Sequence, residues 1–101
     1  MSRHHLPSID GWHTVAVGWD APTGTYFAQV LDWADAVILD RGSPIDPITD
    51  PTAVLNLVRD HVIEMPAGLA ALLAADRDAA PHDPRRLAQA TALLTVLRDA
   101  A

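Results

Sequence analysis

The sequence contains neither cysteine nor lysine, and both absences limit what the protein can do. Without cysteine, the chain forms no disulfide, no thiolate metal site and no cysteine nucleophile. Such a composition is typical of a protein from a reducing compartment. All seven fixed positive charges are arginines, and only one of the thirteen acidic residues is a glutamate, Glu64. We interpret this bias as the mark of a GC-rich bacterial coding sequence.

Long apolar runs and glycine-rich loops are also missing. The longest near-apolar stretch, residues 65–75, is about half as long as the roughly 20 residues that a membrane helix needs. Residues 1–7 contain no apolar signal-peptide core. The five glycines are scattered rather than gathered in a phosphate-binding loop, and no serine lies in a nucleophile elbow. We therefore expect a cytoplasmic protein without membrane contact, cofactor or metal, and the lack of a catalytic motif argues against an enzyme.

The negative charge of the chain is concentrated in its middle third. The whole chain has a net charge of −6, and residues 20–50 carry six aspartates against Arg41 alone, a net charge of −5. A field of this sign repels phosphate backbones and attracts basic surfaces. The charge pattern therefore predicts a basic protein partner and no direct contact with nucleic acid.

The first half of the chain has the pattern of strands. Residues 12–19 and 25–33 each divide into two faces with the period of two that a strand requires, and a short loop with proline and glycine joins them as in a hairpin. Residues 36–40 form a shorter third run. The pattern predicts a three-stranded antiparallel meander, preceded by a loose N-terminal arm over residues 1–11.

The second half has the pattern of helices. Asp50-Pro51 and Asp83-Pro84 each combine an N-cap aspartate with a proline at the first helical position. Apolar residues recur at helical spacing as far as Met65, again over residues 69–73, and from Pro84 to Ala101. We expect an α+β fold in which two to three helices pack on one face of the meander. Neither half alone buries its apolar face, so residues 1–101 are expected to form a single domain.

The aromatic side chains are concentrated in the predicted hairpin, and they give the first candidates for a binding surface. Packing against the helices would take about two rings into the core, and the others would lie on the outer face or at an edge as anchors for a partner. We predict eight partner-binding residues, which combine the aspartates of the acidic segment with aromatic rings: Asp20, Asp32, Asp35, Asp40, Asp46, Trp12, Tyr26 and Trp33.

The histidines offer an alternative chemistry. His61 and Glu64 lie three residues apart, on one face of the predicted first helix, as a metal or acid–base pair would. One histidine and one glutamate supply at most half of a metal site, and the other reading is an exposed pair within the helix. His13 is expected to be half-buried among strand residues, and His82 is expected beside the cap of the last helix.

Part of the sequence resembles the HicB antitoxin family. The run Tyr26-Phe27-Ala28-Gln29-Val30, followed by Asp32, is similar to a run in the hairpin of those proteins, and the resemblance covers about half of the chain. It implies a β-β-β-α core and an acidic protein that masks a basic toxin.

These observations favour a small acidic, non-enzymatic binding protein. Its partner would be a basic protein, as for an antitoxin, an inhibitor or a nucleic-acid mimic. The alternatives are a metal-assisted enzyme that uses His61 and Glu64, and a homodimer subunit joined through the hairpin or the last helix.

Overall fold

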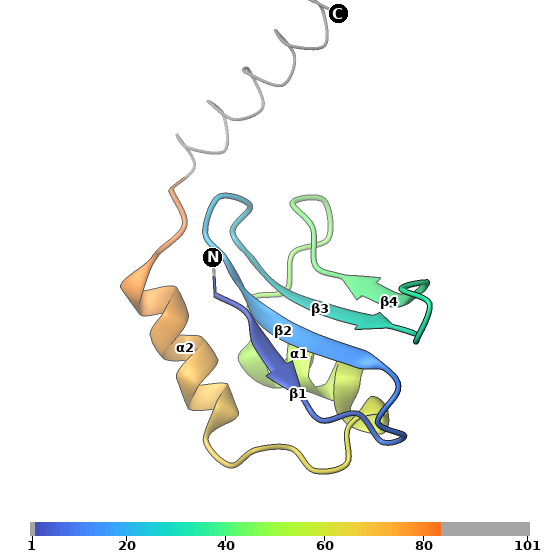
Figure 1. Ribbon diagram of the computed structural model, residues 1–101. Coiled ribbons are helices and arrows are strands. Elements are labelled where there is room, and N and C mark those ends of the chain that lie inside the picture. Colours follow the sequence, from blue (N-terminus) through green and yellow to red (C-terminus); the bar gives the residue numbers. More distant parts are fainter. Residues whose placement is uncertain (1, 84–101) are drawn as a thin grey trace, which may run out of the picture.

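The computed structural model describes residues 2–83 of the chain, which form one antiparallel sheet with helices on one side (Figure 1). Four strands lie in the order β1-β2-β3-β4, so that each strand pairs with its neighbour in sequence. The elements are β1 (His4–Leu6), β2 (Thr14–Asp20), β3 (Thr25–Leu31), β4 (Val37–Arg41), α1 (Pro51–Val58), the 3₁₀ helix η1 (Arg59–His61) and α2 (Leu69–Ala79). The predicted α+β class is confirmed, and the predicted helix from Pro84 to Ala101 lies outside the described residues.

The sheet has four strands rather than three because the N-terminal arm supplies β1. His4 pairs with Val17 and Leu6 pairs with Val15, and the Leu6 side chain is only 8% exposed. A strand of three residues is too short to produce a visible alternation, and the proline after it is typical of a loop. The prediction of a loose arm over residues 1–11 is therefore wrong.

Strands β2 and β3 form the predicted hairpin, in register from Thr14 opposite Leu31 to Asp20 opposite Thr25. Gly24 adopts a left-handed φ of 71° in the turn, and its N–H donates to the carbonyl of Asp20 at 2.8 Å. The alternation directs one set of side chains toward the helices. These buried residues are Val15, Val17, Trp19, Tyr26, Ala28 and Val30.

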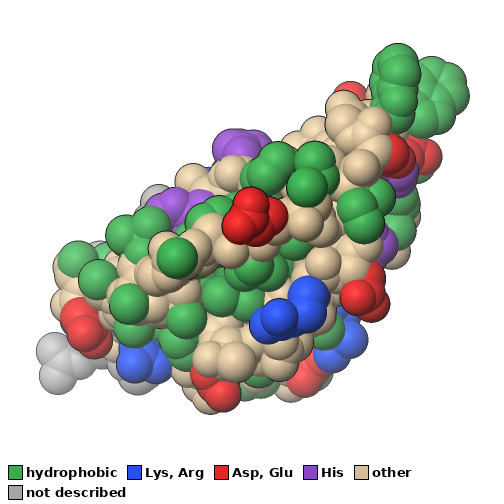
Figure 2. All heavy atoms as spheres, turned by 90° about the horizontal axis from the view of Figure 1, so that it is seen from below, with side chains coloured by type: hydrophobic (Ala, Val, Ile, Leu, Met, Phe, Trp, Pro, Cys, Tyr) green, Lys and Arg blue, Asp and Glu red, His purple; other side chains and the backbone are tan. Residues whose placement is uncertain are grey.

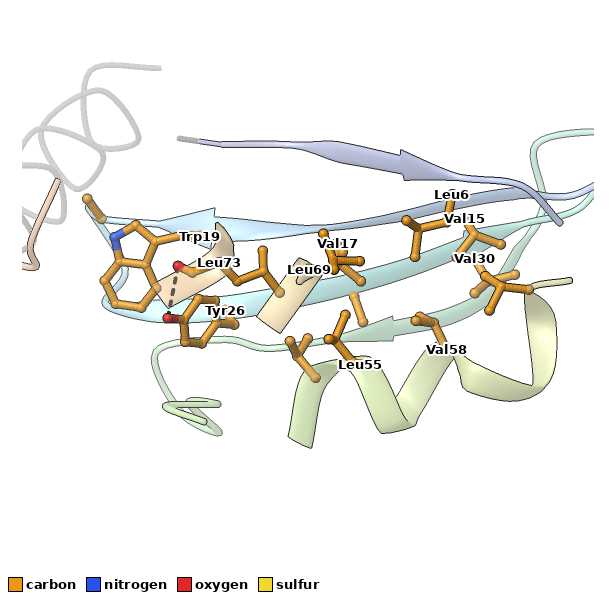
Figure 3. Packing of buried hydrophobic residues seen from close by; sticks show 14 residues of the cluster. Leu6, Val15, Val17, Trp19, Tyr26, Val30, Leu55, Val58, Leu69 and Leu73 are labelled. Carbon is orange, nitrogen blue, oxygen red and sulfur yellow. Dashed lines mark hydrogen bonds between the residues drawn. The ribbon is translucent and has the colours of Figure 1, made fainter. Parts of the chain in front are cut away.

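The core lies between this face and the two helices (Figure 3). Tyr26 and Trp19 pack together with ring centroids 4.9 Å apart. The Tyr26 hydroxyl donates to the carbonyl of Leu73 at 3.1 Å, and Trp19 Nε1 donates to the carbonyl of Ala80 at 2.6 Å. Both rings thereby bury apolar area while their polar atoms keep a partner. The sequence prediction that about two rings enter the core is confirmed.

Helix α1 begins where predicted and ends earlier than predicted. Asp50 caps it by accepting from the N–H of Thr52 at 2.9 Å, with Pro51 at the first helical position. After η1 the chain becomes extended, because the carbonyl of His61 accepts from Ile9 at 2.9 Å and Ser8 bridges Val62. Pairing with the N-terminal segment thus replaces the last predicted helical turn.

Two further findings concern the helices. The predicted second helix is confirmed as α2, which begins at Leu69, just after Gly68 in a left-handed conformation with a φ of 78°. Within residues 2–83, no helix is long and apolar enough to cross a membrane.

Candidate protein-binding site

One end of the sheet carries most of the exposed large hydrophobic side chains. We define the tryptophan end as residues 7–13, 32–37 and 59–64. Of the eight exposed large hydrophobic residues in the described part of the chain, five lie there: Ile9, Trp12, Trp33, Val37 and Ile63. Figure 2 shows hydrophobic side chains projecting from the end of the molecule that carries the turn between β3 and β4. A surface of this kind is typical of an interaction site.

The strand register explains why these residues meet at one end. Trp12 and Trp33 each lie two residues beyond the last pair of β2 and β3, Thr14 opposite Leu31. Leu31 also pairs with Val37 at the start of β4. The 59–64 segment joins this end through the bridge between Ser8 and Val62, which brings the neighbours Ile9 and Ile63 to the same place.

Trp12 is held by a turn that Asp10 organises. One carboxylate oxygen of Asp10 accepts from the N–H of Trp12 at 2.9 Å and from the N–H of His13 at 3.3 Å. The other oxygen lies 2.6 Å from Nδ1 of His13. The hydrogen bonds from the His13 ring and from the Trp12 backbone hold the pKa of the Asp10 carboxyl well below its usual range. The turn fixes the Trp12 backbone while the ring is 73% exposed.

Trp33 is held in a similar way by Asp32. A carboxylate oxygen of Asp32 accepts from the N–H of Ala34 at 2.8 Å and from the N–H of Ala36 at 2.9 Å. Asp35 has a left-handed φ of 61°, the conformation that closes a three-residue hairpin loop. Aspartate tolerates this conformation better than most side chains. The loop presents the Trp33 ring 78% exposed, which makes it the more exposed of the two.

The tryptophan end is acidic as well as apolar. Five carboxylates lie in its three segments, against the single guanidinium of Arg59: Asp10, Asp32, Asp35, Asp60 and Glu64. Arg59 donates to Asn56 Oδ1 at 3.1 Å and makes no ion pair among the described residues. An apolar centre with negative charge around it suits a partner whose apolar patch is flanked by basic side chains.

The structure gathers half of the predicted partner-binding residues and separates the rest. Trp12, Trp33, Asp32 and Asp35 lie together at the tryptophan end, while the other four residues do not. Tyr26 is completely buried, so its prediction as a surface contact is wrong.

The remaining predicted aspartates are dispersed. Asp20 and Asp40 lie on the outer face of the sheet, away from the tryptophan end, and Asp46 lies 3.4 Å from Nη2 of Arg41. The acidic segment therefore does not form a single surface. Several of its carboxylates are used locally, as Asp32 is in its hairpin loop and Asp50 is in its helix cap.

Several residues of the tryptophan end were missed as partner-binding residues at the sequence level, among them Ile9, Asp10, Val37, Asp60 and Ile63. Asp10-Gly11 is a turn signal that could have been found, because aspartate often accepts from the N–H two residues further on. No pattern in the sequence indicates that Ile9 and Ile63 lie close together, because their proximity depends on the bridge between segments more than fifty residues apart.

Among the described residues, the histidines do not assemble a metal site. His61 ends η1, and the extended Val62 separates it from Glu64, so the prediction that the two share one helix face is wrong. His82 Nδ1 lies 2.8 Å from the carbonyl of Ala21, beside the hairpin turn. Within residues 2–83, no group of three or more histidine, aspartate or glutamate side chains is arranged to hold a metal ion.

Comparison of the chain with protein-family models, curated proteins and solved structures finds no match. The resemblance to HicB antitoxins therefore stays a prediction.

Proposed function

We propose that this chain is a non-enzymatic binding module that docks a basic protein partner onto its tryptophan end. Trp12 and Trp33 would insert into an apolar patch of the partner. The carboxylates beside them would face its arginine or lysine side chains.

One observation carries the proposal: two tryptophans are more than two-thirds exposed, and each is fixed by a turn that an aspartate organises. An exposed tryptophan contributes little to folding, whereas at an interface it buries a large area and loses few rotatable bonds. Because the backbone on both sides of each ring is already hydrogen-bonded, binding would cost little additional ordering.

The charge of the site supports a basic partner rather than a neutral one. The carboxylates of Asp35 and Asp60 make no ion pair among the described residues, so they are available to a cation from outside. Exposed charges of this kind steer association and are screened by salt. Binding should therefore weaken as the ionic strength rises.

Affinity capture with matched variants tests the proposal. Lysate of the source organism is passed over the immobilised wild-type chain, a Trp12→Ala/Trp33→Ala variant and an Ile45→Ala control. Ile45 is an exposed hydrophobic residue that follows the far end of β4. We expect a basic protein that the wild type and the Ile45→Ala control retain, that the tryptophan variant loses, and that salt releases.

The result that would overturn the proposal is equal retention of every captured protein by the three baits. Light scattering of the purified chain tests whether the tryptophan end instead joins two copies of the chain. A dimer that the tryptophan substitutions dissociate would contradict a basic partner and assign the tryptophan end to self-association.

A further inference from the structure

The outer face of the sheet carries a second feature, which is separate from the tryptophan end. A shallow hollow of about 140 Å³ lies on the side opposite the helices. Residues from all four strands, or from just before them, line it: Arg3, Asp20, Phe27, Gln29 and Asp40. Because an antiparallel sheet with one covered face usually keeps the other polar, an aromatic ring among charged groups here calls for an explanation.

The floor of the hollow includes an aromatic ring that a glycine makes room for. Phe27 lies opposite Gly18 in the hairpin, and its ring covers the glycine. A Cβ at residue 18 would overlap the backbone carbonyl oxygen of Ser2 and meet the Phe27 ring at 2.7 Å, so a larger residue would clash with the N-terminal backbone as well as displace the ring. The pair of Gly18 and Phe27 thus places an aromatic surface on the open face of the sheet.

The chain already places a guanidinium group on this surface. The Arg3 guanidinium carbon lies 5.8 Å from the centroid of the Phe27 ring, within range of a cation–π contact. Arg3 Nη2 also donates to Gln29 Oε1 at 2.7 Å. The ring and the amide oxygen therefore accept a planar cation in this geometry.

The carboxylates of the hollow are not neutralised by Arg3. Among residues 2–83, neither Asp20 nor Asp40 forms an ion pair with it. One oxygen of Asp20 is shielded from solvent and receives no hydrogen bond from any described residue. A shielded carboxylate oxygen without a hydrogen-bond donor is destabilising, and positive charge held nearby in the hollow would offset part of that cost. The lining carries two carboxylates and one guanidinium, so one further positive charge would balance its charge.

We infer that this hollow binds the guanidinium group of an arginine side chain from another molecule, and that Arg3 is an internal occupant of the same surface. Guanidinium suits the lining better than ammonium, because it stacks on an aromatic ring and donates two parallel hydrogen bonds to a carboxylate. The inference does not depend on the tryptophan end, since the two surfaces share no residue.

The test is a nuclear magnetic resonance titration of the full chain with N-acetyl-arginine methylamide. The citrulline analogue serves as the control probe, because it has nearly the same shape without the charge. We expect saturable shifts of the Phe27, Gln29 and Asp40 amides with the arginine probe alone. The lysine analogue should bind more weakly.

Three variants make the assignment specific. Asp40→Asn, at an exposed strand position, should weaken binding about fivefold, as the loss of one charge-assisted contact would. Asp78→Asn, on α2, should leave the affinity unchanged. Arg3→Gln should tighten binding, because it removes a like charge. Shifts that do not saturate, equal shifts with the citrulline analogue, or weaker binding to Arg3→Gln would each overturn the inference.

Discussion

At the scale of single residues, the aspartates beside the two exposed tryptophans act first on their own backbone. Asp10 and Asp32 each accept from two N–H groups within four residues of themselves. A pattern of charge along the sequence does not distinguish such a carboxylate from one that faces solvent. Asp32 was therefore predicted in the right segment and Asp10 was missed, while the local role of Asp32 became visible only with its hydrogen bonds.

Replacing Asp32 tests its role in the hairpin loop. Asp32→Ala removes the acceptor of two N–H groups and should lower the free energy of unfolding by about 1–3 kcal/mol. Asp32→Asn keeps an acceptor oxygen and should cost less than half as much. Urea unfolding of the two variants measures the difference. Equal losses would mean that charge, and not the acceptor, stabilises the loop.

The Asp10 carboxyl gives a prediction about pH. Its pKa is lower in the folded chain than in the unfolded chain, so its contribution to stability is complete above the ordinary carboxyl pKa and is lost as the pH falls from there toward the lower pKa of the folded chain. The free energy of unfolding should therefore fall between about pH 5 and pH 2. Asp10→Asn should make this fall shallower in urea titrations at several pH values. An unchanged slope would contradict the role assigned to the contact with His13.

At the scale of elements, the parts with a long periodic pattern were predictable and the short pairings were not. The alternation of the hairpin and the Asp50-Pro51 helix start were read correctly because each depends on neighbours in sequence. Strand β1 and the early end of α1 have one cause, the pairing of residues 4–9 with distant segments. Tertiary contacts of this kind leave no periodicity to detect.

A comparison of two substitutions tests whether the N-terminal arm is a strand of the core. Leu6→Ala should lower the free energy of unfolding by about 2–4 kcal/mol, because it opens a cavity under β1. Ile9→Ala, three residues further on at an exposed position, should change it by less than about 0.5 kcal/mol. Chemical denaturation measures both values. If the N-terminal arm were loose, both substitutions would change the free energy of unfolding only slightly.

The contact between β1 and α2 explains how so short a strand is held. His4 Nε2 lies 2.6 Å from Asp76 Oδ2. Partial burial raises the pKa of Asp76, but hydrogen bonding to His4 and Ser2, together with the charge of His4, outweighs the burial and holds the pKa below its usual range. The polar contact therefore adds to the packing of Leu6, and acid should loosen the first strand along with the Asp10 turn.

At the scale of the whole molecule, the fold places the predicted partner-binding residues on different surfaces. The fold class followed from the order of strand and helix patterns along the chain. The gathering of exposed hydrophobic residues at one end could not be predicted, since it arises from three segments that the strand register and one bridge bring together. The net charge alone suggested a continuous acidic surface, and the fold distributes that charge over the tryptophan end, the outer face and the helix cap.

Acrylamide quenching of tryptophan fluorescence tests the central claim most directly, because the chain contains one buried and two exposed tryptophans. Trp19 supplies a protected baseline, and the emission of Trp12 and Trp33 should be strongly quenched in the free chain. The account predicts that adding the captured basic partner protects these two rings from quenching, and that raising the salt concentration, which releases the partner, restores the quenching. A complex that forms while both rings stay as accessible as in the free chain would contradict it.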